Sequence, residues 1–199
     1  MSAPPRGRPR SFDRDAALEK AMLLFWARGY EATSIGDLTA AMGIGAPSLY
    51  AAFGDKATLF AEVVRTFGER YGGFTAAAMA EEPTAADMVR RILHEAAYEY
   101  TRTDCPRGCL VTSAGINTTS EEVAGLLRDL RNGNIRAFAE RIQTDIDAGL
   151  LPPDTNAAAS ARYVGAVMFG MSQSARDGAT REELAAVARI AAAHWTGTS

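Results

Sequence analysis

Apolar residues recur at helical spacing along almost the whole chain, and no segment follows the two-residue period of a strand. The sequence is therefore predicted to be all-α, with about nine helices. Four of the expected helices precede residue 72, and five follow residue 83. They cover residues 13–28, 35–42, 46–53, 56–71, 84–103, a short stretch after 109, 120–147, 156–176 and 181–195.

Capping residues define the second and third helices closely. Ser34 can cap residues 35–42, and Asp37 stands where its carboxylate reaches back in a capping box. Gly43 fits a left-handed helix end, and Pro47 fits the first turn of the next helix after Gly45. Two short helices around such a tight turn are typical of a helix-turn-helix unit, whose second helix lies in the DNA major groove.

Three later helices have their own predicted starts, and residues 72–83 are predicted to be a loose connection flanked by Gly72-Gly73 and Pro83. The predicted caps are Thr84 with Asp87, Thr119 with Glu122, and Thr180 with Glu183.

The helix-turn-helix unit and the chain start supply the candidate DNA contacts. No Arg, Lys, Asn or Gln lies between Gly45 and Phe53, so few side chains there can make bidentate contacts to bases. Specificity is therefore expected to depend on DNA shape and half-site spacing. The candidate contacts are Thr33, Ser34, Gly45, Ala46, Pro47, Ser48, Tyr50 and Lys56, with Arg6, Arg8 and Arg10 as a basic arm.

The formal net charge of −3 does not suggest a nucleic-acid-binding protein, but its distribution along the chain does. Residues 1–60 hold seven Arg or Lys against six Asp or Glu, so the excess of acidic residues lies in the remainder. DNA affinity requires positive charge near the phosphates rather than a basic protein overall.

Five collinear motifs in residues 11–62 resemble the DNA-binding domain of the TetR family of bacterial transcriptional regulators. They are Phe25-x-x-x-Gly29-Tyr30, Thr33-Ser34-Ile35, Gly43-Ile44, Leu49-Tyr50-x-x-Phe53 and Lys56-x-x-Leu59-Phe60. The resemblance covers about a quarter of the chain. It implies an all-α homodimer, usually a repressor, whose larger C-terminal domain binds a small-molecule inducer. Gly45, Thr39, Met42 and Ala52 depart from the family pattern, and Ala52 replaces a common histidine.

The domain prediction follows from this resemblance. Residues 1–10 are expected to be a disordered basic arm, 11–56 the DNA-binding domain, and 57–199 the ligand-binding and dimerisation domain. Helices 156–176 and 181–195 carry small and apolar residues on more than one face, which favours a four-helix dimer interface. The residues predicted to surround the ligand are Phe67, His94, Tyr98, Cys109, Ser113, Phe138, Met168 and Met171.

The cysteines leave an alternative function open. Cys105 and Cys109 could sense oxidants or electrophiles, with Arg102 and Arg107 favouring the thiolate, or they could be two small buried side chains. An all-α enzyme and an architectural DNA-binding protein without ligand are further alternatives. We expect no cofactor and no metal site, because His94 and His194 are the only histidines and lie far apart. Without a signal peptide or an apolar run long enough to span a membrane, a cytoplasmic location is expected.

Overall fold

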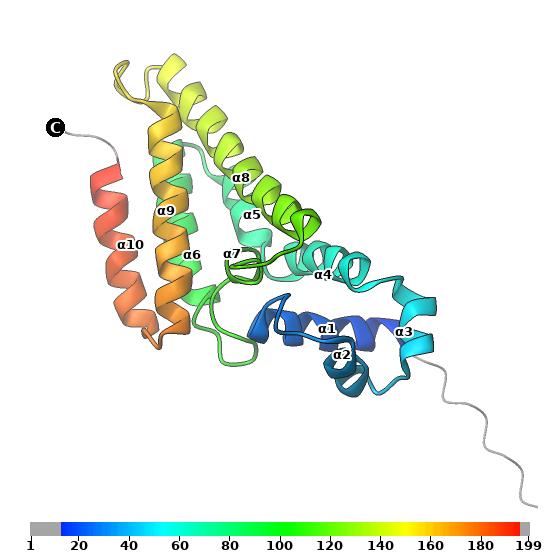
Figure 1. Ribbon diagram of the computed structural model, residues 1–199. Helices are drawn as coiled ribbons and strands as arrows, with labels where there is room; N and C mark the ends of the chain where they lie inside the picture. Colours follow the sequence, from blue (N-terminus) through cyan, green and yellow to red (C-terminus); the bar gives the residue numbers. More distant parts are fainter. Residues whose placement is uncertain (1–12, 196–199) are drawn as a thin grey trace, which may run out of the picture.

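The computed structural model describes residues 13–195, and ten α-helices account for most of this range (Figure 1). The all-α prediction is confirmed. In chain order the helices are α1 (Arg14–Arg28), α2 (Ile35–Met42), α3 (Ala46–Phe53), α4 (Lys56–Arg70), α5 (Gly73–Glu81), α6 (Ala85–Glu99), α7 (Leu110–Ser113), α8 (Glu121–Asp147), α9 (Ala157–Arg176) and α10 (Arg181–Trp195).

The predicted helix-turn-helix geometry is confirmed at α2 and α3. The Ser34 hydroxyl accepts the backbone N–H of Asp37 at 3.0 Å, and the Asp37 carboxylate accepts the N–H of Ser34 at 2.9 Å. Gly43 ends α2 with a φ of 74°, in the left-handed region that favours glycine. Pro47 lies in the first turn of α3, where its missing N–H leaves no hydrogen bond unmade.

Aromatic rings fill the core between α1 and α4. The Phe25 and Phe60 rings meet edge to face at 5.0 Å, and the Trp26 and Phe67 rings do so at 4.8 Å. Leu49 and Phe53 of α3 are buried against this core, as predicted. The same core continues into residues of α7 and α8, so the helix-turn-helix unit packs on the rest of the chain.

A second core joins α6 to the long helices that follow it. Figure 1 shows α8, α9 and α10 side by side, with α6 behind them, at the end of the molecule away from α2 and α3. Helix α10 packs mainly on α6, and α8 packs on α9. Within residues 13–195, no helix combines the length and the apolar character needed to cross a membrane.

Two local predictions were wrong. Residues Gly73–Glu81 form α5 instead of a loose connection, so residues 13–195 contain ten helices rather than nine. Helix α8 is capped by Ser120, whose hydroxyl accepts the N–H of Val123 at 3.3 Å, because Thr119 instead donates its backbone N–H to Glu31 at 2.6 Å. The caps predicted at Thr84 and Thr180 are present.

Two polar contacts tie the end of α1 to distant parts of the chain. Arg176, the last residue of α9, donates to the carbonyl oxygens of Trp26 and Ala27 at 3.1 and 3.2 Å. These carbonyls belong to the last turn of α1, where such groups lack partners within the helix. Glu31, just after α1, accepts the hydroxyls of Thr118 and Thr119 at 2.8 and 3.0 Å.

Candidate DNA-binding surface and effector cavity

Helix α3 presents a small, nearly uncharged surface. Leu49 and Phe53 anchor it inward, whereas Ser48 and Tyr50 point to solvent, with 51% of Tyr50 exposed. The phenol of Tyr50 is therefore free to approach a phosphate. The remaining predicted contacts on this helix are its cap Gly45 and Pro47, both exposed, and the half-buried Ala46.

The two predicted DNA contacts at the start of α2, Thr33 and Ser34, differ in their exposure to solvent. Thr33 is fully buried and donates its hydroxyl to the Gly29 carbonyl at 2.7 Å, so its side chain is not presented to DNA here. Ser34 is exposed, but its hydroxyl already belongs to the capping box with Asp37. Helix N-termini attract anions through their free N–H groups, so α2 can still face a phosphate.

Lys56 lies at the first position of α4 and packs on an aromatic ring. Its Nζ is 4.1 Å from the centroid of the Tyr30 ring, a cation–π geometry. Burial lowers the pKa of Lys56, and the nearby Glu31 carboxylate offsets part of this shift. The lysine therefore has a structural role beside the phosphate contact predicted for it.

The arginine side chains around this surface are engaged within the protein. Arg14 forms two hydrogen bonds with Glu62, at 2.6 and 2.7 Å, and also donates to the Ala52 carbonyl at the end of α3. Its guanidinium lies 4.4 Å from the Phe53 ring centroid. These contacts of Arg14 could not be predicted from local sequence patterns, because its partners are 38 and 48 residues away. Arg6, Arg8 and Arg10 lie outside the described residues.

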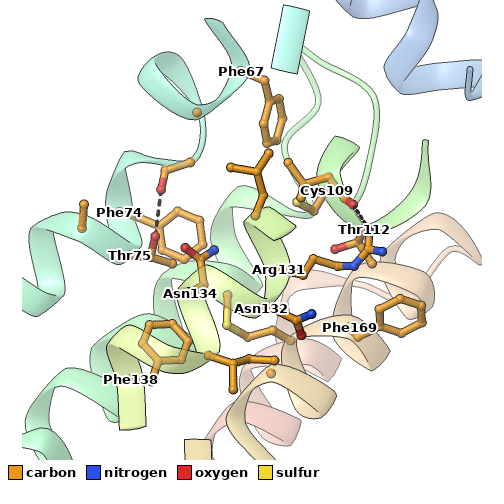
Figure 2. A pocket seen from close by; sticks show the side chains of 18 of the residues that line it. Phe67, Phe74, Thr75, Cys109, Thr112, Arg131, Asn132, Asn134, Phe138 and Phe169 are labelled. Carbon is orange, nitrogen blue, oxygen red and sulfur yellow. Dashed lines mark hydrogen bonds between the residues drawn. The ribbon is translucent and has the colours of Figure 1, made fainter. Parts of the chain in front are cut away.

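A cavity of about 640 Å³ lies between α4, α5, α8 and α9. This volume falls in the range of small-molecule sites. Figure 2 shows the phenyl rings of Phe67, Phe74, Phe138 and Phe169 around its edge, with polar side chains between them. The lining residues are Val64, Phe67, Gly68, Gly72, Gly73, Phe74, Thr75, Ala76, Tyr100, Cys109, Val111, Thr112, Leu130, Arg131, Asn132, Asn134, Ile135, Phe138, Arg162, Gly165, Ala166, Met168 and Phe169.

Four of the eight predicted ligand-binding residues line this cavity: Phe67, Cys109, Phe138 and Met168. The other four do not line it. His94 and Tyr98 lie on the exposed face of α6, and the Arg181 guanidinium stacks on the Tyr98 ring at 4.2 Å.

Met171 and Ser113 are excluded from the cavity by packing and by a local hydrogen bond. Met171 is buried in the second core, and the Ser113 hydroxyl donates to the Cys109 carbonyl at 3.0 Å.

Sequence reasoning also missed the polar lining of the cavity, which α8 and α9 supply. Arg131, Asn132 and Asn134 come from α8, and Arg162 from α9. Arg131 and Asn134 interrupt the helical face that Leu127 and Phe138 mark as inward. This interruption of an apolar stripe by polar residues was the signal that could have revealed them.

The cysteines occupy an environment that disfavours the thiolate. Burial raises the pKa of both Cys105 and Cys109. Arg102, predicted to activate Cys105, is held by Asp104 at 2.6 Å and Glu99 at 3.2 Å. These observations favour the interpretation of both cysteines as small packed side chains. Among residues 13–195, no cluster of three or more His, Cys, Asp and Glu side chains could hold a metal ion.

Comparisons with known proteins agree with this architecture. Residues 17–63 match the profile of the family described as bacterial regulatory proteins, tetR family. The HTH-type transcriptional repressor ComR of Escherichia coli K12 is 35% identical over 96% of this chain and 92% of its own length. The repressor BdcR of the same organism is 32% identical, with 93% and 90% covered.

A solved structure extends the similarity to three dimensions. A cysteine mutant of the TetR-family regulator CifR, in complex with 26-bp double-strand operator DNA, superposes with a TM-score of 0.89. It is 42% identical and covers 94% of this chain and 100% of the CifR chain. The similarity spans the cavity as well as the helix-turn-helix unit, and the chain belongs to the TetR family of bacterial regulatory proteins.

Proposed function

We propose that this protein is a homodimeric transcriptional repressor that leaves a palindromic operator when a small molecule occupies the cavity. The exposed face of α3 reads the DNA, with Ser48 and Tyr50 as its polar side chains. The repressors ComR and BdcR and the operator complex of CifR support this role. Half-sites about 34–36 Å apart, or slightly more, would suit a two-fold dimer.

Helix α4 carries the proposal, because it belongs to both sites. It begins at Lys56, directly after α3, and its later residues Val64, Phe67 and Gly68 line the cavity. A ligand that displaces this helix also displaces α3. Binding releases DNA only if the ligand prefers the non-binding arrangement, and a 100-fold preference corresponds to about 2.7 kcal/mol.

A second connection runs through α9. This helix contributes Arg162, Met168 and Phe169 to the cavity, and its last residue, Arg176, holds the end of α1. Because α1 packs on α2, a shift of α9 would reach the DNA-binding surface by a route independent of α4.

The dimer interface is proposed on α9 and α10, the helices predicted for it. Large apolar side chains stand exposed there: Tyr163 (40%), Phe169 (45%), Val187 (43%) and Ile190 (63%). Exposed apolar faces of this kind mark association surfaces.

The alternative functions fit the structure less well. Raised cysteine pKa values weaken the thiol-sensor alternative, and a cavity of this size favours a ligand-responsive regulator over an architectural protein. We propose that the protein acts by binding alone, without catalysis. We propose that it acts in the cytoplasm, where chromosomal DNA is accessible.

Operator binding tests the proposal. Sequencing the genomic fragments retained by the purified protein identifies the operator, and fluorescence anisotropy then measures its affinity. Tyr50→Ala should weaken binding about tenfold, about 1.4 kcal/mol. Tyr98→Ala is the matched control, because Tyr98 is equally exposed (49%) but lies far along the chain on α6. Equal affinity of the Tyr50 variant and the parent would contradict DNA reading by this face of α3.

Sedimentation tests the dimer. Ile190→Glu should give monomers that no longer bind the operator, because a carboxylate buried in the interface has no partner. Leu150→Glu, at an equally exposed apolar residue (60%) outside α9 and α10, should remain dimeric. A dimeric Ile190 variant would place the interface elsewhere.

A further inference from the structure

The charge of the cavity is strongly one-sided. Two of its lining side chains are cationic, Arg131 and Arg162, and no Asp, Glu, Lys or His is present among the described residues that line it. The chain as a whole is acidic, with 24 Asp and Glu against 21 Lys and Arg. A cavity lined with arginine and without carboxylates is therefore a specific property of this site.

Arg131 is half-buried without a carboxylate partner. Its Nη1 donates to the Val111 carbonyl at 2.8 Å, and no ion pair to it is found within residues 13–195. Burial lowers the pKa of Arg131, as expected for a charge with little compensation. A guanidinium has five N–H donors, so most of them remain available to a ligand.

Three of the four other half-buried arginines of this protein behave differently, whereas Arg107, like Arg131, has no carboxylate partner among the described residues and donates to the Ala179 carbonyl. Arg91, Arg102 and Arg141, with side chains 27%, 29% and 20% exposed, each pair with at least one carboxylate. The fold thus supplies a carboxylate to these three cations and leaves the one beside the cavity without one.

Arg162 of α9 adds a second cation to the lining of the cavity. Its side chain is exposed, and Nη1 donates to the side-chain amide oxygen Oδ1 of Asn132 at 3.4 Å. Asn132 directly follows Arg131 on α8, so this contact joins Arg162 of α9 to the part of the lining that α8 supplies. The Cys109 thiol and the Thr112 hydroxyl lie near the same region.

The rest of the cavity is mostly apolar, and its polar side chains, Thr75, Tyr100 and Asn134, are uncharged. Four phenyl rings and Met168 leave only the region around Arg131 able to hold a charge. We infer that the effector is an organic carboxylate with an aromatic or aliphatic body, whose carboxylate binds Arg131 while its body packs among the phenyl rings. Arginine suits this ligand class because its planar N–H pairs match both oxygens of a carboxylate. The proposed ligand class stands by itself, and only the claim that this ligand is the inducer rests on the proposed function.

Matched pairs of ligands test the inference. Straight-chain and phenyl-substituted carboxylic acids are titrated into the full-length dimer beside their primary amides, and binding is measured by calorimetry without DNA. The acids should bind at least about tenfold more tightly than the amides, as expected for a charge-assisted hydrogen bond. Equal or tighter binding of the amides would overturn the inference, and so would a failure of all the acids to bind.

Arginine variants assign the contact. Arg131→Gln should remove the preference for acid over amide, and Arg131→Lys should restore part of it by returning the charge. Arg128→Gln is the control, because Arg128 lies one turn away on α8, is exposed and does not line the cavity. A preference that survives in Arg131→Gln would contradict the assignment.

Operator release is measured separately. If the acids bind with the expected preference but leave DNA binding unchanged, the inducer role fails while the ligand class stands. If amides release the operator as well as acids do, the repressor function stands and the ligand class fails.

Discussion

The core between α1 and α4 and the wall of the cavity use the same kind of side chain in opposite ways. In the first, Phe25, Trp26 and Phe60 are buried and meet their neighbours edge to face at about 5 Å. In the second, four phenyl rings surround about 640 Å³ of open volume. The first arrangement fixes the relative positions of α1 and α4, whereas the second leaves room for a ligand to rearrange its walls.

This difference indicates how one chain can both fix the position of its DNA-binding surface and allow a ligand to shift that position. A close-packed core resists compression, so a displacement of one of its helices is passed on to the others. An open cavity can bind a ligand without first breaking contacts between side chains. We therefore expect a ligand that enters the cavity to displace the close-packed core between α1 and α4 as a unit.

The largest predicted effect compares one ring from each of these two regions. Phe25→Ala should destabilise the protein by about 3 to 5 kcal/mol, because it leaves a hole in a packed core. Phe74→Ala should cost roughly half of this or less, since one side of that ring already faces the cavity. Urea denaturation monitored by circular dichroism measures both. Equal losses would contradict the contrast in packing.

The next effect concerns the contact between Gly108, just before α7, and helix α9. This residue has a φ of 81°, and a Cβ atom there would lie 2.7 Å from the backbone oxygen of Ser172 on α9. Gly108→Ala should therefore destabilise the protein by about 2 to 4 kcal/mol through strain and overpacking together.

A helical glycine provides the control for this substitution. Gly133→Ala, where nothing closer than 3.9 Å meets the new Cβ, should instead stabilise by about 0.5 to 1 kcal/mol. Denaturation midpoints that move in the same direction for both variants would argue against the close approach of residue 108 to α9.

The smallest effect concerns the pH dependence of the contact at Glu31. Hydrogen bonds from Thr119 and Thr118 lower the pKa of this carboxylate below its usual value of 4.5. Its contribution to stability is therefore complete above pH 4.5 and is lost as the pH falls through the lowered pKa. Glu31→Gln should lose stability at neutral pH and approach the parent in acid. If the stability curves of the parent and Glu31→Gln run parallel from neutral to acidic pH, Glu31 does not contribute to the pH dependence of stability.

The sequence predicted most reliably what local chemistry determines. The capping box at Ser34, the left-handed Gly43 and the proline in α3 all act within a few residues, and each was found where predicted. Helix α5 was missed because its cap, Gly72, has no side chain to signal a start. Its alanine-rich sequence was compatible with a helix but was bounded by residues typical of a loop.

The cavity was harder to predict because it depends on which face of each helix turns inward. The apolar face of α6 is buried in the second core, so His94 and Tyr98 lie on its exposed face. The missed α5 contributes Phe74 and Thr75 to the cavity wall. Contacts such as Arg14 with Glu62 and Arg176 with α1 join residues too distant in sequence for any local pattern to reveal.

The contact of Arg176 with α1 also bears on how the protein is made. The Trp26 carbonyl accepts a hydrogen bond from Arg176, which lies 150 residues later in the chain. At about 5 to 20 residues per second, a ribosome needs roughly 8 to 30 s to supply that arginine after α1 has been synthesised. During that interval the helix-turn-helix sequence has all its local caps but lacks this anchor at the end of α1. A nascent chain is therefore expected to acquire full DNA-binding competence only after α9 has been synthesised.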